Sequence, residues 1–158
     1  MKIFKSVKNA GTPEVTVSSD NFVQIDKLDS ISVKVKKDSQ LLITLTVPDT
    51  WCDTAGKGAW FAIQIDKKSI VARGLYTCGI KGQRVPIVLQ ALVDITSDSE
   101  VEVVAQWHSI ENATCNIGSA SETVLTVLVN DEQSQNEMLE AQIKKYLQNG
   151  TKGGKWPF

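Results

Sequence analysis

The stretch LLITLTV, residues 41–47, alternates between apolar and polar side chains and decides the fold class. Its two faces differ: one carries Leu41, Ile43, Leu45 and Val47, and the other carries Thr44 and Thr46. Successive side chains of a β-strand point to opposite faces of a sheet, so this period of two predicts a strand that is buried on one side.

The same alternation recurs between about residue 15 and residue 129. The clear runs are 31–35, 85–93, 101–107 and 123–129, and the weaker ones are 15–17, 22–25, 60–65, 70–76 and 114–117. The run 123–129 is apolar on both faces, which predicts a central strand. Roughly nine or ten strands without an internal repeat or linker predict one all-β sandwich, residues 1–130, of the jelly-roll type.

The segment 131–158 differs in character from the sandwich. It has no β-branched run, and it places Leu139 and Ile143 at helical spacing with Tyr146 or Leu147, while Gly150 provides a stop signal. These features predict a short C-terminal α-helix followed by an irregular tail. We expect the helix to pack on its own domain; the alternative is a short coiled coil that joins several subunits.

Composition restricts the partners and the compartment. Only two of the seventeen basic residues are arginines, Arg73 and Arg84, and the formal net charge is -1, so we expect no nucleic acid partner. The N-terminus has no apolar run of a secretory signal, and no apolar stretch is long enough for membrane insertion. We therefore expect cytoplasmic synthesis, with release by a non-classical route needed for any role outside the cell.

Few residues are suited to catalysis or metal binding. Cys52, Cys78 and Cys115 lack zinc-ligand spacing, and we expect free thiols, with pairing of two of them as the alternative. The acidic residues are scattered, so we expect neither a metal nor another cofactor. His108 is the single histidine and no catalytic motif is present, so we do not expect an enzyme. A cysteine hydrolase using Cys52 or Cys78 with His108 is a minor hypothesis.

Aromatic placement is the remaining functional signal. Trp51 falls in a predicted turn within VPDTWCDTAGKGAWFAI, residues 47–63, and Trp60 alternates with the apolar series that begins at Phe61. Two exposed indoles would form a stacking surface for the apolar face of a sugar, and Arg84 in GQRVP, residues 82–86, would donate to its hydroxyls. The alternative is that both tryptophans belong to a subunit interface or a sheet rim.

Six strings of the sequence share their order and spacing with one family. They are NFVQIDKL (21–28), LTVPDTW (45–51), AWFAI (59–63), IVARGLYT (70–77), QRVPIVLQALVDI (83–95) and VVAQWHS (103–109). Over about residues 15–129 the chain resembles the TNF-like, fucose-binding N-terminal domain of bacterial two-domain superlectins. The resemblance implies a jelly-roll homotrimer, a calcium-independent lectin for terminal fucose or a related monosaccharide. It also implies three sugar sites between neighbouring subunits, which would bind fucosylated or related oligosaccharides.

The resemblance also assigns site residues. Trp51 and Trp60 stand at the positions of the family's two sugar-site tyrosines, Thr77 at its threonine, Cys78 at the next tyrosine, Arg84 at one arginine and Glu111 at the other. A carboxylate accepts hydrogen bonds where a guanidinium donates them, so Glu111 would accept hydrogen bonds at a position of the site where the family's arginine donates them. Glu111 would accept from a hydroxyl or form an ion pair with Arg84 across an inactive site. The alternative function is a trimeric TNF/C1q-like structural or protein-interaction module without a sugar site.

Overall fold

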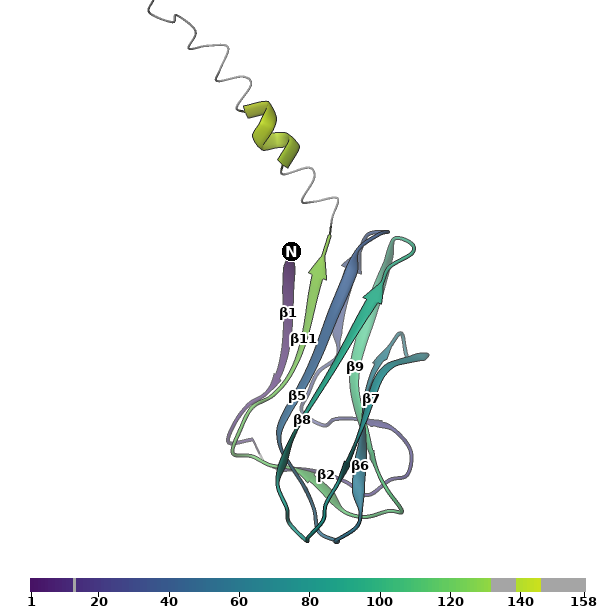
Figure 1. Ribbon diagram of the computed structural model, residues 1–158, viewed down its shortest axis with the longest axis vertical. Helices are drawn as coiled ribbons and strands as arrows, with labels where there is room; N and C mark the ends of the chain where they lie inside the picture. The colour runs from purple at the N-terminus through teal and green to yellow at the C-terminus, as the bar shows by residue number, and fades with distance from the viewer. Residues whose placement is uncertain (13, 132–138, 146–158) are drawn as a thin grey trace, which may run out of the picture.

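Two antiparallel β-sheets pack face to face in the computed structural model, which describes residues 1–12, 14–131 and 139–145 (Figure 1). Sheet I contains β1 (Lys2–Lys8), β2 (Val15–Val17), β5 (Gln40–Cys52), β8 (Val85–Asp94), β10 (Cys115–Ile117) and β11 (Thr123–Asn130). Sheet II contains β3 (Val23–Gln24), β4 (Ile31–Val35), β6 (Gly58–Ile65), β7 (Ser69–Thr77) and β9 (Ser99–Ser109).

The long strands have the order of a jelly roll. They run β1-β11-β5-β8 in sheet I and β4-β9-β6-β7 in sheet II, so the chain passes repeatedly from one sheet to the other. The short strands β10 and β2 extend sheet I beside the last residues of β5. Strand β11 lies between β1 and β5, which confirms the prediction that the run 123–129 is central.

The core lies between the inner faces of the two sheets. Leu41, Ile43, Leu45 and Val47 of β5 are fully buried, as the alternation predicts. Phe61 and Trp107 meet them from sheet II, with 5.7 Å between their ring centroids. The residues that alternate with this inner set, among them Trp51, Trp60 and His108, are consequently placed on the outer faces.

Two parts of sheet I differ from the sequence-based expectation. Strand β1 was not predicted, because lysines interrupt its alternation. Trp51 does not lie in a turn: β5 continues through Cys52, since a register shift between Val47 and Thr50 takes Pro48 out of the hydrogen-bond ladder. The tryptophan is therefore held on a paired strand and not on a loop.

The described part of the C-terminal segment, residues 139–145, is helical. Leu139 and Ile143 are 57% and 50% exposed, so these two apolar side chains do not pack on the sandwich as expected, whereas Tyr146 and Leu147 lie outside the described residues. The coiled-coil alternative stays a prediction. The rest of the predicted helix and the tail, 132–138 and 146–158, lie outside the described residues. Within the described part of the chain, no helix has the length and apolar character needed to cross a membrane.

Candidate functional site

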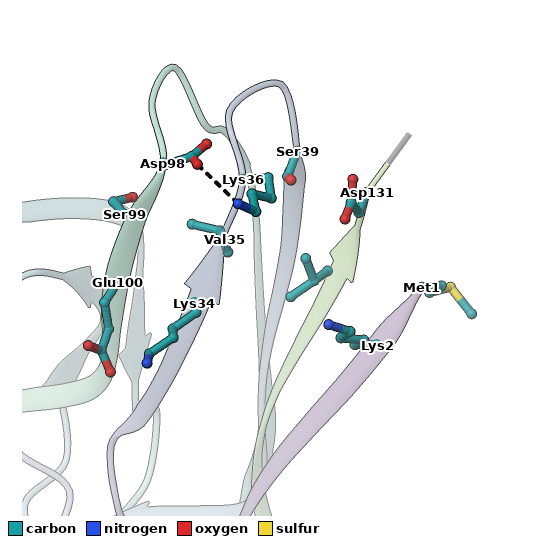
Figure 2. Close-up of a pocket in the computed structure, with 11 residues that line it drawn as sticks. Met1, Lys2, Lys34, Val35, Lys36, Ser39, Asp98, Ser99, Glu100 and Asp131 are labelled. Atoms are coloured by element: carbon teal, nitrogen blue, oxygen red, sulfur yellow. Dashed lines mark hydrogen bonds and ion pairs between the residues drawn. The ribbon is translucent and has the colours of Figure 1, made fainter. Parts of the chain in front are cut away.

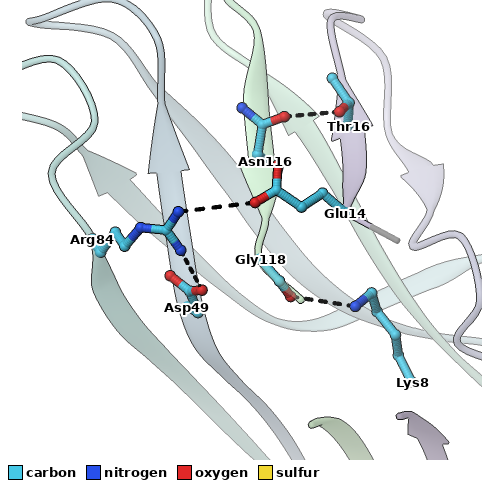
Figure 3. Close-up of polar contacts among 7 residues, drawn as sticks. All are labelled: Lys8, Glu14, Thr16, Asp49, Arg84, Asn116 and Gly118. Carbon is cyan, nitrogen blue, oxygen red and sulfur yellow. Dashed lines mark hydrogen bonds and ion pairs between the residues drawn. The ribbon is translucent and has the colours of Figure 1, made fainter. Parts of the chain in front are cut away.

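Trp51 occupies the outer face of sheet I in a row of paired side chains. The row crosses three strands, since Trp51 pairs with Asn116 of β10, and Asn116 pairs with Thr16 of β2. The Thr16 hydroxyl donates to Asn116 Oδ1 at 2.8 Å (Figure 3). This bond fixes the amide next to the indole, so the sheet and not a loop determines where Trp51 lies.

Arg84 lies over the Trp51 ring and is held there by acids. Its Cζ is 5.6 Å from the ring centroid, and Nη1 donates to Asp49 Oδ2 at 2.5 Å. Glu14 Oε1 is 3.9 Å from Nη2 on the other side (Figure 3). A guanidinium has five N–H donors, and the Arg84 side chain remains 52% exposed, so donors are left for a ligand.

Gly118 makes the Arg84–Asp49 pair possible. A Cβ at this position would lie 1.9 Å from Asp49 Oδ2 and 3.0 Å from Arg84 Nη1, so a side chain here would displace the carboxylate. The Gly118 backbone is held on both sides, because its N–H donates to the Asp49 carbonyl at 2.8 Å and its carbonyl accepts from Lys8 Nζ at 3.3 Å. The buried ammonium of Lys8 thus anchors the segment beneath the site.

A disulfide joins two of the three strands that carry this row, β5 and β10. Cys52 of β5 and Cys115 of β10 face each other in the register and are bonded, so the expectation of three free thiols is wrong and its alternative, one pair, is correct. Spacing along the sequence does not show this, because the pairing depends on which strands become neighbours. The bond lies next to Trp51 and Asn116 and holds β10 against β5.

The remaining predicted site residues lie mainly on sheet II. Trp60 is on its outer face, paired with Leu75 on one side and His108 on the other, and Thr77 is exposed at the end of β7. Arg73 lies over the Trp60 ring, with its Cζ 5.3 Å from the centroid. The structure therefore separates the two indoles: Trp51 and Trp60 share no stacking surface within one chain.

Glu111 forms an ion pair with Lys57 and not with Arg84. Glu111 and Asn112 have positive φ angles of 50° and 54°, a tight turn fixed by the Ile110 N–H, which donates to the Gly58 carbonyl at 2.9 Å. The turn places the Glu111 carboxylate beside the start of β6. The ion pair with Arg84 that the sequence left open is absent among the described residues, and Lys57 supplies a donor beside the acceptor.

Cys78 is buried, so its side chain is not presented on the surface next to Thr77. Its thiol donates to the Thr54 carbonyl at 3.0 Å. Burial, together with the neighbouring Cys78, raises the pKa of Tyr76 to about 12, and the Tyr76 hydroxyl donates to the Gln83 carbonyl at 2.6 Å. This bond fixes the loop that leads to Arg84.

The residues of the minor hydrolase hypothesis do not form a catalytic pair among the described residues. Cys52 is bonded to Cys115, and Cys78 contacts backbone carbonyls. The His108 ring packs edge-on against Phe22 with centroids 4.5 Å apart, and its Nδ1 is 2.9 Å from the Ser109 carbonyl oxygen. The described residues also contain no group of three or more potential metal ligands.

A cleft of about 550 Å³ lies at the other end of the sandwich, near the start of β1 (Figure 2). Its lining contains pairs of oppositely charged residues: Lys36 Nζ donates to Asp98 at 3.2 Å, and Lys34 pairs in the register with Glu100. The Lys37 N–H and the Lys36 ammonium hold the pKa of the Asp98 carboxyl below its usual value. None of the described residues that line this cleft is aromatic, so it lacks a stacking surface for a sugar.

Comparison of the sequence with models of protein families gives no match, and comparison with curated proteins finds no similar one.

Proposed function

We propose that this protein is a calcium-independent lectin that binds terminal fucose or a related monosaccharide of glycans at sites between the protomers of a homotrimer. One observation carries the proposal: an indole with an arginine over it occurs on the outer face of each sheet. Here the sheet I half-site means Trp51 and Arg84, and the sheet II half-site means Trp60, Thr77 and Glu111.

The separation of the two half-sites supports a ring of subunits. Two different faces of one chain meet only when sheet I of one protomer approaches sheet II of the next, and such head-to-tail contacts form a ring when the rotation between neighbouring protomers closes. The outer face of sheet I also favours self-association. Its apolar residues are aligned in the register, where Ile3 faces Leu128, Leu128 faces Leu42 and Leu42 faces Leu92.

Several side chains of this apolar surface are exposed to solvent in the single chain. Leu92 is 63% exposed and Val88 is 58% exposed on the neighbouring strand β8. Contiguous exposed apolar patches mark interaction surfaces in soluble proteins, and burial against further copies would remove these side chains from water. Because Trp51 is on the same outer face, the subunit contact and the sheet I half-site would be adjacent.

The groups present suit a hydroxyl-rich ligand. An indole packs against the C–H face of a pyranose, while Arg84 donates and Glu111 accepts. Lys57 offers a donor beside Glu111, so the position where the family has its second arginine has both a hydrogen-bond donor and an acceptor. Three weak sites on one trimer would act together on a glycan-bearing surface through avidity.

We also propose that the protein acts outside the cell after release by a non-classical route. The Cys52–Cys115 disulfide supports this, because structural disulfides persist in oxidising surroundings and are rare in a reducing cytosol. Neither nucleic acid nor membrane insertion enters this proposal.

Replacing Arg84 by alanine is expected to weaken glycan binding by more than about tenfold, the effect of losing hydrogen bonds to a charged group. The apolar face of sheet I is untouched, so the trimer should persist. A glycan array and size-exclusion chromatography with light scattering measure both properties. Arg84→Lys keeps a cation beside Asp49 and is the second variant to use where loss of that cation prevents folding. Lys81→Ala, on the preceding loop, is the matched control.

Undiminished binding by the Arg84→Ala trimer would remove that residue from the site. A wild-type array without signal, together with a protein partner recovered by pull-down, would support the alternative of a TNF/C1q-like structural or interaction module.

A further inference from the structure

Both arginines of the chain lie over tryptophans, whereas none of the lysines in the described part of the chain does. Arg84 lies over Trp51 in sheet I, and Arg73 lies over Trp60 in sheet II. Arg84 has a role in the proposed sugar site. Arg73, on β7, lies beside Trp60 but contacts no part of the sugar in that proposal.

The two guanidinium groups differ in whether carboxylates lie close enough to neutralise their charge. Arg84 has Asp49 and Glu14 within ion-pair distance, whereas no carboxylate among the described residues lies within that distance of Arg73. The register surrounds Arg73 with neutral groups, since it faces Ala62, and Ala62 faces Gln106 on the far side. The nearest charged residue on this face of β9, Glu102, is paired with Lys67 at 3.5 Å. The outer face of sheet II beside Trp60 therefore carries an uncompensated positive charge at Arg73.

The indole of Trp60 leaves the N–H groups of Arg73 available to bind an anion. A guanidinium that lies over an aromatic ring keeps its N–H groups at its edge, in a fork that matches two oxygens of a carboxylate or a sulfate. Hydrogen bonds between a guanidinium and an anion are about twice as strong as those between neutral groups. Arg73 is exposed, so an oxyanion would reach it without rearrangement of the sheet.

We propose that Arg73 binds an acidic group, a carboxylate or a sulfate ester, on the sugar residue next to the one held at Trp60. Arg73, Leu75 and Thr77 alternate along the outer face of β7, so Arg73 lies on the side of Trp60 away from Thr77. A second sugar residue extending in that direction would place its substituent over Arg73. This proposal rests on the proposed lectin function and makes acidic glycans its ligand class.

The test compares the binding of three soluble probes to the 158-residue chain by isothermal titration calorimetry. The probes are a neutral fucosylated trisaccharide, the same trisaccharide carrying N-acetylneuraminate, and the same trisaccharide carrying a sulfate ester. We expect at least one acidic probe to bind about tenfold more tightly than the neutral one, with this ratio falling as salt screens the charge. The sialylated and sulfated probes distinguish the two sources of the oxyanion.

The variant Arg73→Gln should reduce the ratio of acidic to neutral affinity to about one, because glutamine keeps a polar side chain but no charge. Lys68→Gln, on the β6–β7 turn, removes the same charge elsewhere and should keep the ratio. A merely structural cation–π contact would alter stability and leave the ratio unchanged.

The outcomes separate this assignment from the proposed function. Equal affinity of the wild type for all three probes, or an unchanged ratio in Arg73→Gln, would overturn the role of Arg73 and leave the lectin standing. Absence of binding to every probe, together with an array that gives no signal, would overturn both.

Discussion

Replacing Cys115 by serine is expected to lower the free energy of unfolding by about 4 kcal/mol, because the lost bond closes a loop of 63 residues in the unfolded chain. The effect has a second component. Strand β10 has only three residues, and the disulfide holds it against β5 beside Trp51. Urea denaturation followed by circular dichroism measures the change.

The controls for this variant are the other two cysteines. Cys52→Ser and the double variant should match Cys115→Ser, because all three remove the same bond. Cys78→Ser keeps a hydroxyl that can donate to the Thr54 carbonyl, and its cost should be much smaller. A Cys115→Ser protein as stable as the oxidised wild type would show that the disulfide contributes nothing to the folded state.

The variant Gly118→Ala is expected to weaken glycan binding by more than about tenfold and to cost roughly 1–3 kcal/mol of stability, as overpacking of a buried position does. The added methyl group would lie 1.9 Å from Asp49 Oδ2, so the carboxylate must leave its place. Arg84 then loses the acceptor that holds it over Trp51. The array and urea denaturation measure the two effects.

A double-mutant cycle shows whether Asp49 is the cause of this loss. Asp49→Ala removes the two atoms that would lie nearest the new methyl group, Asp49 Oδ2 and Cγ, so Gly118→Ala should cost much less stability in the Asp49→Ala background. Ser119→Ala, at the next residue, is the control for a change in the same segment. Wild-type binding by Gly118→Ala would mean that the position of Arg84 does not depend on this close approach.

Most of the sandwich follows from alternation in the sequence. Strands such as β5 and β11 were predicted because burial of one face, or of both, imposes a pattern that needs no knowledge of neighbours. Strand β1 was missed because its lysines hide the alternation, and Trp51 was placed in a turn because Pro48 resembles a strand end. In both cases the pairing with neighbouring strands prevails over local sequence preference.

The site was less predictable than the fold. Placement of Arg84 beside Trp51 agrees with the expectation, whereas the separation of Trp51 from Trp60 depends on which sheet each strand joins. The contributions of Asp49 and Gly118 were missed, since a close approach of a carboxylate to a glycine leaves no sequence signal. Arg73 did have a sequence signal, because it is the other of only two arginines in a chain rich in lysine.

The central claim is that each sugar site is divided between two protomers. Its most direct test mixes two inactive variants, Arg84→Ala in the sheet I half-site and Trp60→Ala in the sheet II half-site, by refolding them together. Every mixed trimer then contains one contact where two intact half-sites meet, so an equal mixture should regain about one quarter of the wild-type number of sites. Calorimetric titration with methyl α-L-fucopyranoside counts them. Recovery near one quarter is the predicted result, and a mixture as inactive as its parents would contradict a divided site.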